Sequence, residues 1–261
     1  MNSSFKGKNA LVIASSQGLG KAIAKNLAQQ GVNVMISSRE AGKLQDVKTE
    51  LEQTSVGKIA YKACNIKDKN EIKSLVKATI SEFGSIDLLV NNAGGPPAGT
   101  FEEMTDDDWQ HAFELNLLSY IRVIREVLPH MKKNGGKIVN IASSSVKEPI
   151  PGLILSNTFR VGIVGLTKTL ASEFAAYNIL INTVAPGRIA TDRLQYLDSF
   201  IAEKQGISKE EIQELRKKDI PLGRYGKPEE FANYVSFLLS DANSYMTGQT
   251  FLIDGGLVKS I

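Results

Sequence analysis

The stretch NALVIASSQGLGKAIA, residues 9–24, joins an apolar run of strand length to a segment with helical spacing. Gly18 and Gly20 lie at the turn between the two. The first turn of a helix offers unpaired backbone N–H groups and a partial positive charge, and glycine lets a phosphate approach that backbone closely. Two glycines also fit an ordinary strand-to-helix turn, so the loop predicts a phosphate site only together with its surroundings.

The rest of the chain repeats this alternation. Segments that space apolar residues three and four apart, such as 20–30, 69–83 and 106–133, separate further apolar runs. These runs are VNVMIS (32–37), KIAYKAC (58–64), IDLLVNN (86–92), GKIVNIA (136–142), ILINTVA (179–185) and QTFLIDG (249–255). Strands that alternate with helices indicate parallel pairing. We therefore expect an α/β protein with a Rossmann-type, doubly wound, seven-stranded parallel sheet, in a single domain over residues 1–261.

Composition narrows the class of protein. With 261 residues, 42% of them hydrophobic, the chain is long enough for one domain with a sizeable core. A net charge of +3 without a block of like charge argues against nucleic acid as a partner. The first apolar run, 10–14, is too short for a signal peptide or a membrane span, so we expect a cytoplasmic protein. One cysteine, Cys64, and two histidines, His111 and His130, predict neither a disulfide nor a metal site.

The end of the second strand bears on the choice of cofactor. About twenty residues after a phosphate loop, an acidic residue would bind the ribose 2′-hydroxyl of NAD. This chain has SSRE there, residues 37–40. Ser38 and Arg39 offer space and positive charge for a 2′-phosphate, which favours NADP over NAD. A solvated arginine that Glu40 partly neutralises is the alternative.

Residues 192–225 interrupt the alternation of strands and helices. This charged, amphipathic stretch follows a strand end, where open parallel sheets bind ligands. It fits a lid over a substrate, and it also fits a pair of ordinary surface helices. Tyr196 lies in this segment and is a candidate proton donor by its reach.

Three further motifs carry a family resemblance: NNAG (91–94), VAPGRIATD (184–192) and MTGQTFLIDGG (246–256). With the glycine loop, they resemble the short-chain dehydrogenase/reductase family, and the last 36 residues up to Gly256 are most similar to its 3-oxoacyl-(acyl-carrier-protein) reductase branch. The resemblance runs from about Gly7 to Gly256. It implies a small-molecule substrate and a homo-oligomer, a tetramer or a dimer, paired through long helices such as 113–128.

The resemblance also implies cofactor contacts, position by position. They are Ser16, Gln17, Gly18, Leu19 and Gly20 at the pyrophosphate, Asn65 and Ile66 at the adenine, Asn92, Ala93 and Gly94 along the ribose, and Pro186, Gly187, Ile189 and Thr191 around the nicotinamide. Two positions depart from the family pattern, because Ala14 replaces a glycine of the loop and Asn65 replaces an aspartate. Both changes predict a weaker hold on the cofactor.

The family's chemistry rests on a tyrosine that exchanges the substrate proton, a lysine four residues later, a serine that binds the substrate oxygen, and an asparagine that holds a water. Motif alignment assigns the serine to Ser143 and the asparagine to Asn116. Thirteen residues after Ser143, the family spacing, stands Ser156, and four further on stands Arg160. None of the seven tyrosines is followed four residues later by lysine. The predicted catalytic residues are therefore Asn116, Ser143, Ser156 and Arg160.

This paired replacement leaves two functions open. A serine hydroxyl is a much weaker acid than a phenol, and arginine keeps its proton at any useful pH, so charge stays while the proton relay is lost. The first hypothesis is an NAD(P)-dependent oxidoreductase that reduces a carbonyl, possibly a 3-oxoacyl thioester, or oxidises the alcohol, with a non-standard proton donor. The second is a catalytically impaired dinucleotide-binding protein that acts as a sensor or a partner subunit.

Lys132, Lys133 and Lys137 fit contact with an acidic carrier protein, or simply a solvated cluster.

Overall fold

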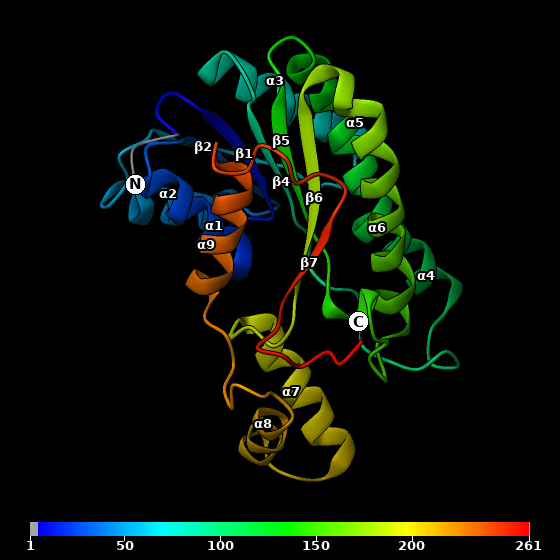
Figure 1. Ribbon diagram of the computed structural model, residues 1–261. Coiled ribbons are helices and arrows are strands. Elements are labelled where there is room, and N and C mark those ends of the chain that lie inside the picture. The colour runs from blue at the N-terminus through cyan, green and yellow to red at the C-terminus, as the bar shows by residue number, and fades with distance from the viewer. Residues whose placement is uncertain (1–4, 261) are drawn as a thin grey trace.

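A seven-stranded parallel sheet forms the centre of the protein, in the order β3-β2-β1-β4-β5-β6-β7 (Figure 1). The computed structural model describes residues 5–260. The strands are β1 (Asn9–Ile13), β2 (Asn33–Ser38), β3 (Ile59–Ala63), β4 (Leu88–Asn91), β5 (Gly136–Ile141), β6 (Ile179–Pro186) and β7 (Thr250–Ile253). Each lies within one of the seven predicted runs or overlaps it closely, so the doubly wound sheet is confirmed. Every residue of β1 and β4 is buried, as continuous apolar runs predict for central parallel strands.

Helices cover both faces of the sheet. One core forms where α1 (Gly18–Gln29), α2 (Ala41–Glu52) and α9 (Pro228–Leu239) pack on the sheet. The other forms under α3 (Lys69–Phe83), α5 (Ser119–Met131) and α6 (Ile154–Phe174). The strand order reverses between β1 and β4, and a ligand of an open parallel sheet binds beyond the carboxyl ends of the strands at such a point.

The predicted helix 106–133 is not one regular helix. It consists of α4 (Asp106–Phe113), a π-helical turn η1 (Glu114–Leu118) and α5. Thr105 starts α4 through a reciprocal cap with Asp108. A π-turn widens the helix by one residue and is frequent at functional sites. Here it contains Asn116, which sequence periodicity alone does not reveal.

The segment after β6 forms α7 (Asp192–Gln205) and α8 (Lys209–Lys218), which extend beyond the carboxyl ends of the strands (Figure 1). Thr191 caps α7 and Ser208 caps α8. Two short 3-10 turns, η2 (Ser144–Val146) and η3 (Ala175–Tyr177), complete the elements described. None of the helices in residues 5–260 combines the length and apolar character that a membrane span requires.

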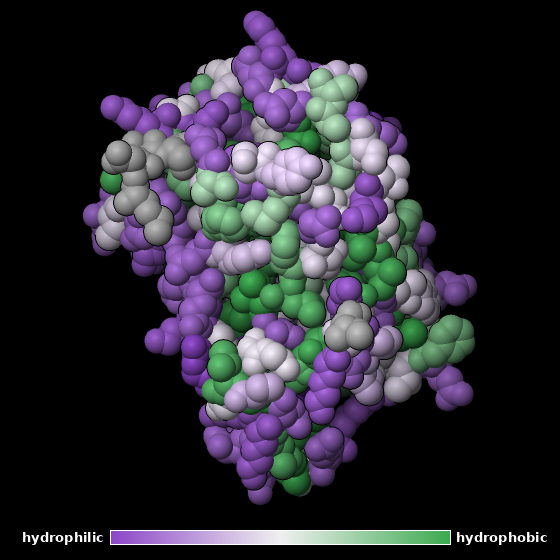
Figure 2. All heavy atoms as spheres, viewed as in Figure 1, coloured by the Kyte–Doolittle hydropathy of each residue, from purple (hydrophilic) through white to green (hydrophobic). Residues whose placement is uncertain are grey.

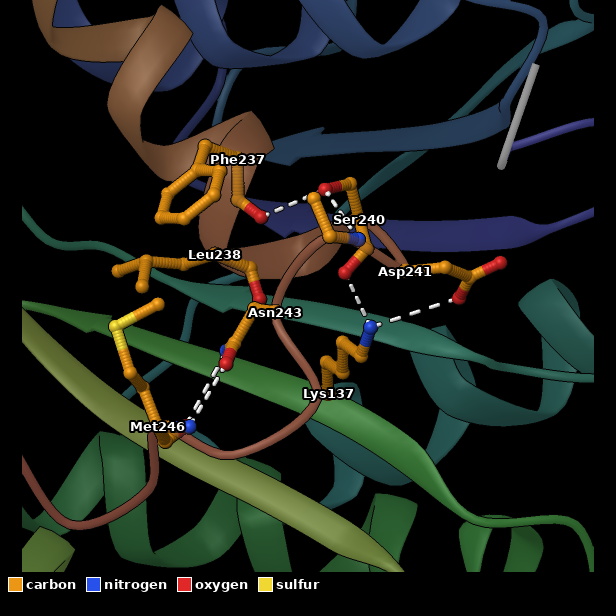
Figure 3. A network of polar contacts seen from close by, with 8 residues as sticks. Lys137, Phe237, Leu238, Ser240, Asp241, Asn243 and Met246 are labelled. Atoms are coloured by element: carbon orange, nitrogen blue, oxygen red, sulfur yellow. Dashed lines mark hydrogen bonds and ion pairs between the residues drawn. The ribbon is translucent and has the colours of Figure 1, made fainter. Parts of the chain in front are cut away.

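Lys137 corrects one sequence expectation. It does not join Lys132 and Lys133 in a solvated cluster, because it lies at the start of β5 and its ammonium group donates to the carbonyl of Ser240 (Figure 3). The Asp241 carboxylate lies 3.5 Å away. Burial lowers the pKa of Lys137. These contacts fasten the connection between α9 and β7 onto the sheet, so Lys137 is a structural residue.

Candidate active site

A cleft of about 1280 Å³ opens between the carboxyl ends of the strands and α7. Nearly all of the predicted cofactor residues line it, both those that the resemblance implied and the Ser38–Arg39 pair. They are Ser16, Gln17, Gly18, Leu19, Ser38, Arg39, Asn65, Ile66, Asn92, Ala93, Gly94, Pro186, Gly187, Ile189 and Thr191. The exception is Gly20, which lies behind the loop, where an added Cβ would stand 2.3 Å from the carbonyl oxygen of Ala14. Gly20 therefore supports the loop through close packing.

The loop between β1 and α1 has the shape of an anion cradle. Gly18 has a φ of +56°, and Ala14 has a φ of +50°, although alanine rarely adopts the left-handed region. The side-chain amide of Asn92 donates to the Ala14 carbonyl at 3.1 Å and ties the loop to the end of β4. The first turn of α1 contains no acidic residue, and no side chain caps it. Its N–H groups and dipole are thus available for a pyrophosphate, which the residues present fit.

The other end of the cleft carries positive charge. Ser38 has a buried hydroxyl oxygen without a hydrogen-bond partner in the described structure. Glu40 pairs with Lys43 at 2.9 Å, so it does not neutralise Arg39. A buried hydroxyl that lacks a partner beside a free arginine fits the oxygens of a 2′-phosphorylated ribose.

Asn65 is only partly free to meet an adenine. Its side-chain oxygen already accepts from the backbone N–H of Lys67 at 3.2 Å, and its own N–H donates to Glu71 at 2.8 Å. The side-chain NH₂ group and the second lone pair of the oxygen remain for a ligand.

Ser143 and Ser156 both line the cleft. Ser143 follows β5 and starts η2, where its hydroxyl oxygen accepts from the Ser145 N–H at 3.2 Å. Ser156 lies in the first turn of α6. Both hydroxyl groups retain a proton to donate toward a substrate oxygen.

Asn116 lies behind the wall of the cleft and is completely buried. Its side-chain NH₂ group donates to the Gly94 carbonyl at 2.7 Å, which holds the loop after β4 in place. The side-chain oxygen has no partner among the described residues. A buried acceptor of this kind calls for a donor such as an ordered water.

Arg160 reaches the cleft from α6 with only 5% of its surface exposed. Its guanidinium donates to the carbonyl of Ile141 at 2.8 Å, to the hydroxyl oxygen of Tyr120 at 3.1 Å and to the carbonyl of Ala93 at 3.3 Å. The Nε–H has no partner in residues 5–260. These oxygens hold a positive charge in one fixed orientation at the strand ends.

Tyr120 is the residue that sequence reasoning missed. It lies on α5, is 1% exposed, and donates its hydroxyl proton to the Ile141 carbonyl at 2.8 Å. Burial raises the pKa of its phenol. A search for a tyrosine followed by a lysine cannot find a tyrosine that reaches the arginine from another helix. Tyr120 does not line the cleft, and neither does any other tyrosine in the described part of the chain.

The structure also shows where Tyr196 and the two histidines lie. Tyr196 does not line the cleft, because its ring lies beside the Arg193 guanidinium at 5.3 Å and is half exposed. Its proposed role as proton donor therefore has no support. His111 and His130 are both exposed. His111 also lines the cleft, with Nδ1 3.1 Å from the Lys67 ammonium.

Several residues of the segment 192–225 line the cleft, and both interpretations of this segment, lid and surface helices, stay predictions. Leu194, Leu197, Phe200 and Ile201 of α7 line the cleft, as does Arg216 of α8.

The buried carboxylate of Asp198 anchors α7. It accepts from the Tyr225 hydroxyl at 3.0 Å and lies 3.6 Å from the Arg188 guanidinium. Burial and the Asp198 charge raise the pKa of Tyr225 to about 12.

The sheet, the phosphate loop and the cleft define an oxidoreductase of the dinucleotide-binding class, and known proteins agree. A family model described as enoyl-(acyl carrier protein) reductase matches residues 13–258. The chain is 37% identical over 255 residues to 3-oxoacyl-[acyl-carrier-protein] reductase FabG of Thermotoga maritima, covering 97% of this chain and 99% of the relative. It is 38% identical to dehydrogenase/reductase SDR family member 4 of Caenorhabditis elegans, covering 97% of this chain and 96% of the relative.

Among solved structures, the fold matches L-sorbose reductase of Gluconobacter frateurii, complexed with NADPH and L-sorbose. The TM-score is 0.94 with 28% identity, and the match covers 100% of both chains. The chain belongs to the short-chain dehydrogenase/reductase family, and it resembles the 3-oxoacyl-(acyl-carrier-protein) reductase branch.

Proposed function

We propose that this protein reduces a carbonyl group with NADPH, and oxidises the corresponding alcohol in reverse, without the tyrosine and lysine of its relatives. The observation that supports the proposal is the buried guanidinium of Arg160, which is held at the carbonyl of Ile141 and lines the same cleft as Ser143 and Ser156. NADP, rather than NAD, fits the cleft because of Ser38 and Arg39. The cofactor, when bound, supplies the hydride.

The two serines and the arginine divide the work at the substrate oxygen. We assign Ser143 and Ser156 to bind that oxygen through their hydroxyl protons. Negative charge develops on the oxygen as hydride arrives, and a fixed positive charge nearby stabilises it without reorganisation. Arg160 provides that charge. Asn116 holds the loop at Gly94 and binds a water through its free oxygen.

Proton delivery is the weak step of this mechanism. Arg160 keeps its proton, and a serine hydroxyl is a poor acid, so the proton comes from water by way of Ser156. Loss of general acid–base help typically costs a factor of about 10² to 10⁴ in rate. We therefore expect a slow reductase compared with relatives that keep the tyrosine and lysine.

The remaining assignments are also proposals. The cofactor contacts are those implied by the resemblance, and residues 192–225 serve as the substrate lid of a single domain over 1–261. The chain forms a homo-oligomer, a dimer or a tetramer, through α4, η1 and α5, where Phe113, Leu117, Leu118 and Ile121 stay partly exposed in the single chain. On the face in Figure 2, hydrophobic side chains gather in the middle and mostly hydrophilic ones lie over α7 and α8. We place the protein in the cytoplasm.

NADPH oxidation against a panel of ketones, sugars and 3-oxoacyl thioesters tests the proposal. Turnover by the wild type that Ser143→Ala abolishes is the expected result. Calorimetry must also show that NADPH binds. If NADPH binds and no substrate is turned over, the protein is the sensor or partner subunit instead.

A further inference from the structure

Arg193 places a second guanidinium inside the cleft. It lies in the first turn of α7, and its side chain packs flat against Gly95, where an added Cβ would stand 2.6 Å from Nε. One of its terminal nitrogens donates to the Pro96 carbonyl at 2.7 Å. The Tyr196 ring lies beside the guanidinium on another side. The side chain is therefore fixed, while its other N–H groups have no hydrogen-bond acceptor among residues 5–260.

Arg193 has no acidic partner in the described part of the chain. Three other cations of the same cleft have acidic partners, since Lys204 pairs with Glu103 at 2.7 Å, Arg216 lies 3.8 Å from Asp219, and Arg188 lies 3.6 Å from Asp198.

Within the described residues, no carboxylate comes within ion-pair distance of either Arg193 or Arg160. Burial lowers the pKa of Arg193, and the nearby positive charge of Arg160 lowers it further. Arg160 is buried and Arg193 is partly buried. Charges withdrawn from water in proteins are normally paired, so these two neighbouring guanidinium groups without a carboxylate partner indicate an anion supplied from outside.

The cofactor does not account for this anion. Thr191, two residues before Arg193, faces the phosphate loop, since its methyl carbon lies 3.7 Å from the position of a Cβ on Gly18. Arg193 instead faces Gly95, beyond the residues assigned to the ribose. The phosphates of the cofactor have their own partners at the start of α1 and at Arg39. The position of Arg193 thus corresponds to the substrate side of the nicotinamide.

We propose that Arg193 binds a carboxylate of the substrate. The substrate class is then an oxo acid in which only a few carbon atoms separate the carbonyl from the carboxylate. This inference rests on the proposed carbonyl reduction. Arg193 offers N–H groups of a rigid fork, which suits a planar carboxylate. Neutral ketones, sugars and thioesters leave the charge unpaired and are poorer substrates. A purely structural Arg193 would act only as a strut between α7 and Pro96.

The first test measures binding without turnover. Butyrate and butyramide, two unreactive probes of equal shape, are titrated calorimetrically into protein saturated with NADP⁺. We expect butyrate to bind at least about tenfold more tightly than butyramide, as for a charge-assisted hydrogen bond. Arg193→Gln, which keeps an amide donor for Pro96, removes this difference. Arg193→Lys keeps part of it, and Arg125→Gln, an exposed arginine of α5 outside the cleft, leaves it unchanged.

The second test compares kcat/KM for 4-oxopentanoate with that for its methyl ester. We expect the acid to be preferred by about tenfold or more in the wild type and the preference to disappear in Arg193→Gln. Equal binding of the two probes overturns the inference, as does a loss of NADP⁺ affinity in Arg193→Gln without a change in probe preference. Turnover of neutral ketones with no preference for acids defeats the inference and keeps the proposed function. A preference for butyrate in a protein that turns over no carbonyl compound supports carboxylate binding by Arg193 and defeats the proposed function.

Discussion

The guanidinium of Arg160 donates to the hydroxyl oxygen of Tyr120 at 3.1 Å, and both residues donate to the same carbonyl, that of Ile141. Arg160 is thereby fixed at the end of β5, directly before the loop that carries Ser143. Because Tyr120 gives its proton to a backbone carbonyl and stays outside the cleft, it supports the arginine instead of serving as an acid. The site thus keeps a tyrosine in contact with a cation, but this tyrosine positions the cation and does not contact the cleft.

Tyr120→Phe removes one acceptor of Arg160 and one donor to Ile141. Hydrogen bonds that involve a charged group contribute about 1.5–3 kcal/mol, so we expect the free energy of unfolding in urea to fall by about that amount. Hydride transfer should also slow, because Arg160 loses its fixed orientation. Tyr177→Phe, which removes the same atom from a partly exposed residue, is the control and should stay within about 0.5 kcal/mol of the wild type. A Tyr120→Phe protein as stable and active as the wild type would refute the supporting role.

Ala14→Gly should stabilise the protein. The left-handed conformation of Ala14, with a φ of +50°, costs about 1–2 kcal/mol for a residue with a Cβ, and glycine avoids most of that cost. The greater freedom of glycine in the unfolded chain offsets part of the gain, about 0.4–1 kcal/mol. Thermal unfolding should give a higher Tm, and NADPH affinity should not fall. Ala78→Gly in the interior of α3 should lower the Tm, and the same sign for both variants contradicts the account of Ala14.

Ser38→Asp should reverse the cofactor preference. A carboxylate at this position can accept from a ribose 2′-hydroxyl and repels a 2′-phosphate. We expect NADPH to bind at least about tenfold more weakly and NADH to bind more tightly, as measured by fluorescence titration. Arg39→Gln should weaken NADPH alone. If neither variant changes the ratio of the two affinities, the 2′-phosphate does not lie at Ser38 and Arg39.

The ion pair between Glu103 and Lys204 links the loop after β4 to α7 and predicts a pH dependence. The Lys204 ammonium lowers the pKa of Glu103 from 4.5 to about 2. Because the folded-state pKa is depressed, the contribution of the pair to stability is complete above pH 4.5 and is lost as the pH falls to about 2. Glu103→Gln should therefore lower the urea midpoint at neutral pH, by an amount that vanishes within this window. Its neighbour Glu102, which is exposed and has no ion-pair partner among residues 5–260, provides the control Glu102→Gln. A difference that persists unchanged down to about pH 2 would contradict the assignment.

The sheet was predictable because its central strands, such as β1 and β4, are buried on both faces and therefore form continuous apolar runs. The assignment of Ser156 and Arg160 to the catalytic positions came from the family spacing, counted from Ser143. Other contacts of the site depend on packing between distant segments. Arg160 and Tyr120 are 40 residues apart, and Arg193 and Pro96 are 97 apart. The periodicity of apolar residues along the sequence does not predict contacts between such distant segments.

Local backbone geometry explains the other differences. The π-turn at 114–118 places Asn116 behind the wall of the cleft, where it contacts Gly94, and helical spacing does not indicate it. Lys137 followed a helix in a lysine-rich stretch, yet it starts a buried strand, so its charge is satisfied by the carbonyl of Ser240 and by Asp241. Sequence composition alone therefore suggested that Lys137 is a surface residue, whereas in the structure it holds the connection between α9 and β7 onto the sheet.

Single-turnover hydride transfer in the Arg160 variants tests the central claim most directly. Enzyme saturated with NADPH is mixed with the carbonyl compound that it reduces fastest, and the loss of reduced cofactor is followed by absorbance. We predict measurable transfer in the wild type and a rate lower by about 10² in Arg160→Gln, the effect typical of removing one preorganised donor, with NADPH still bound. The contradicting result is a wild type that binds NADPH but transfers no hydride, while the double variant Ser156→Tyr, Arg160→Lys does.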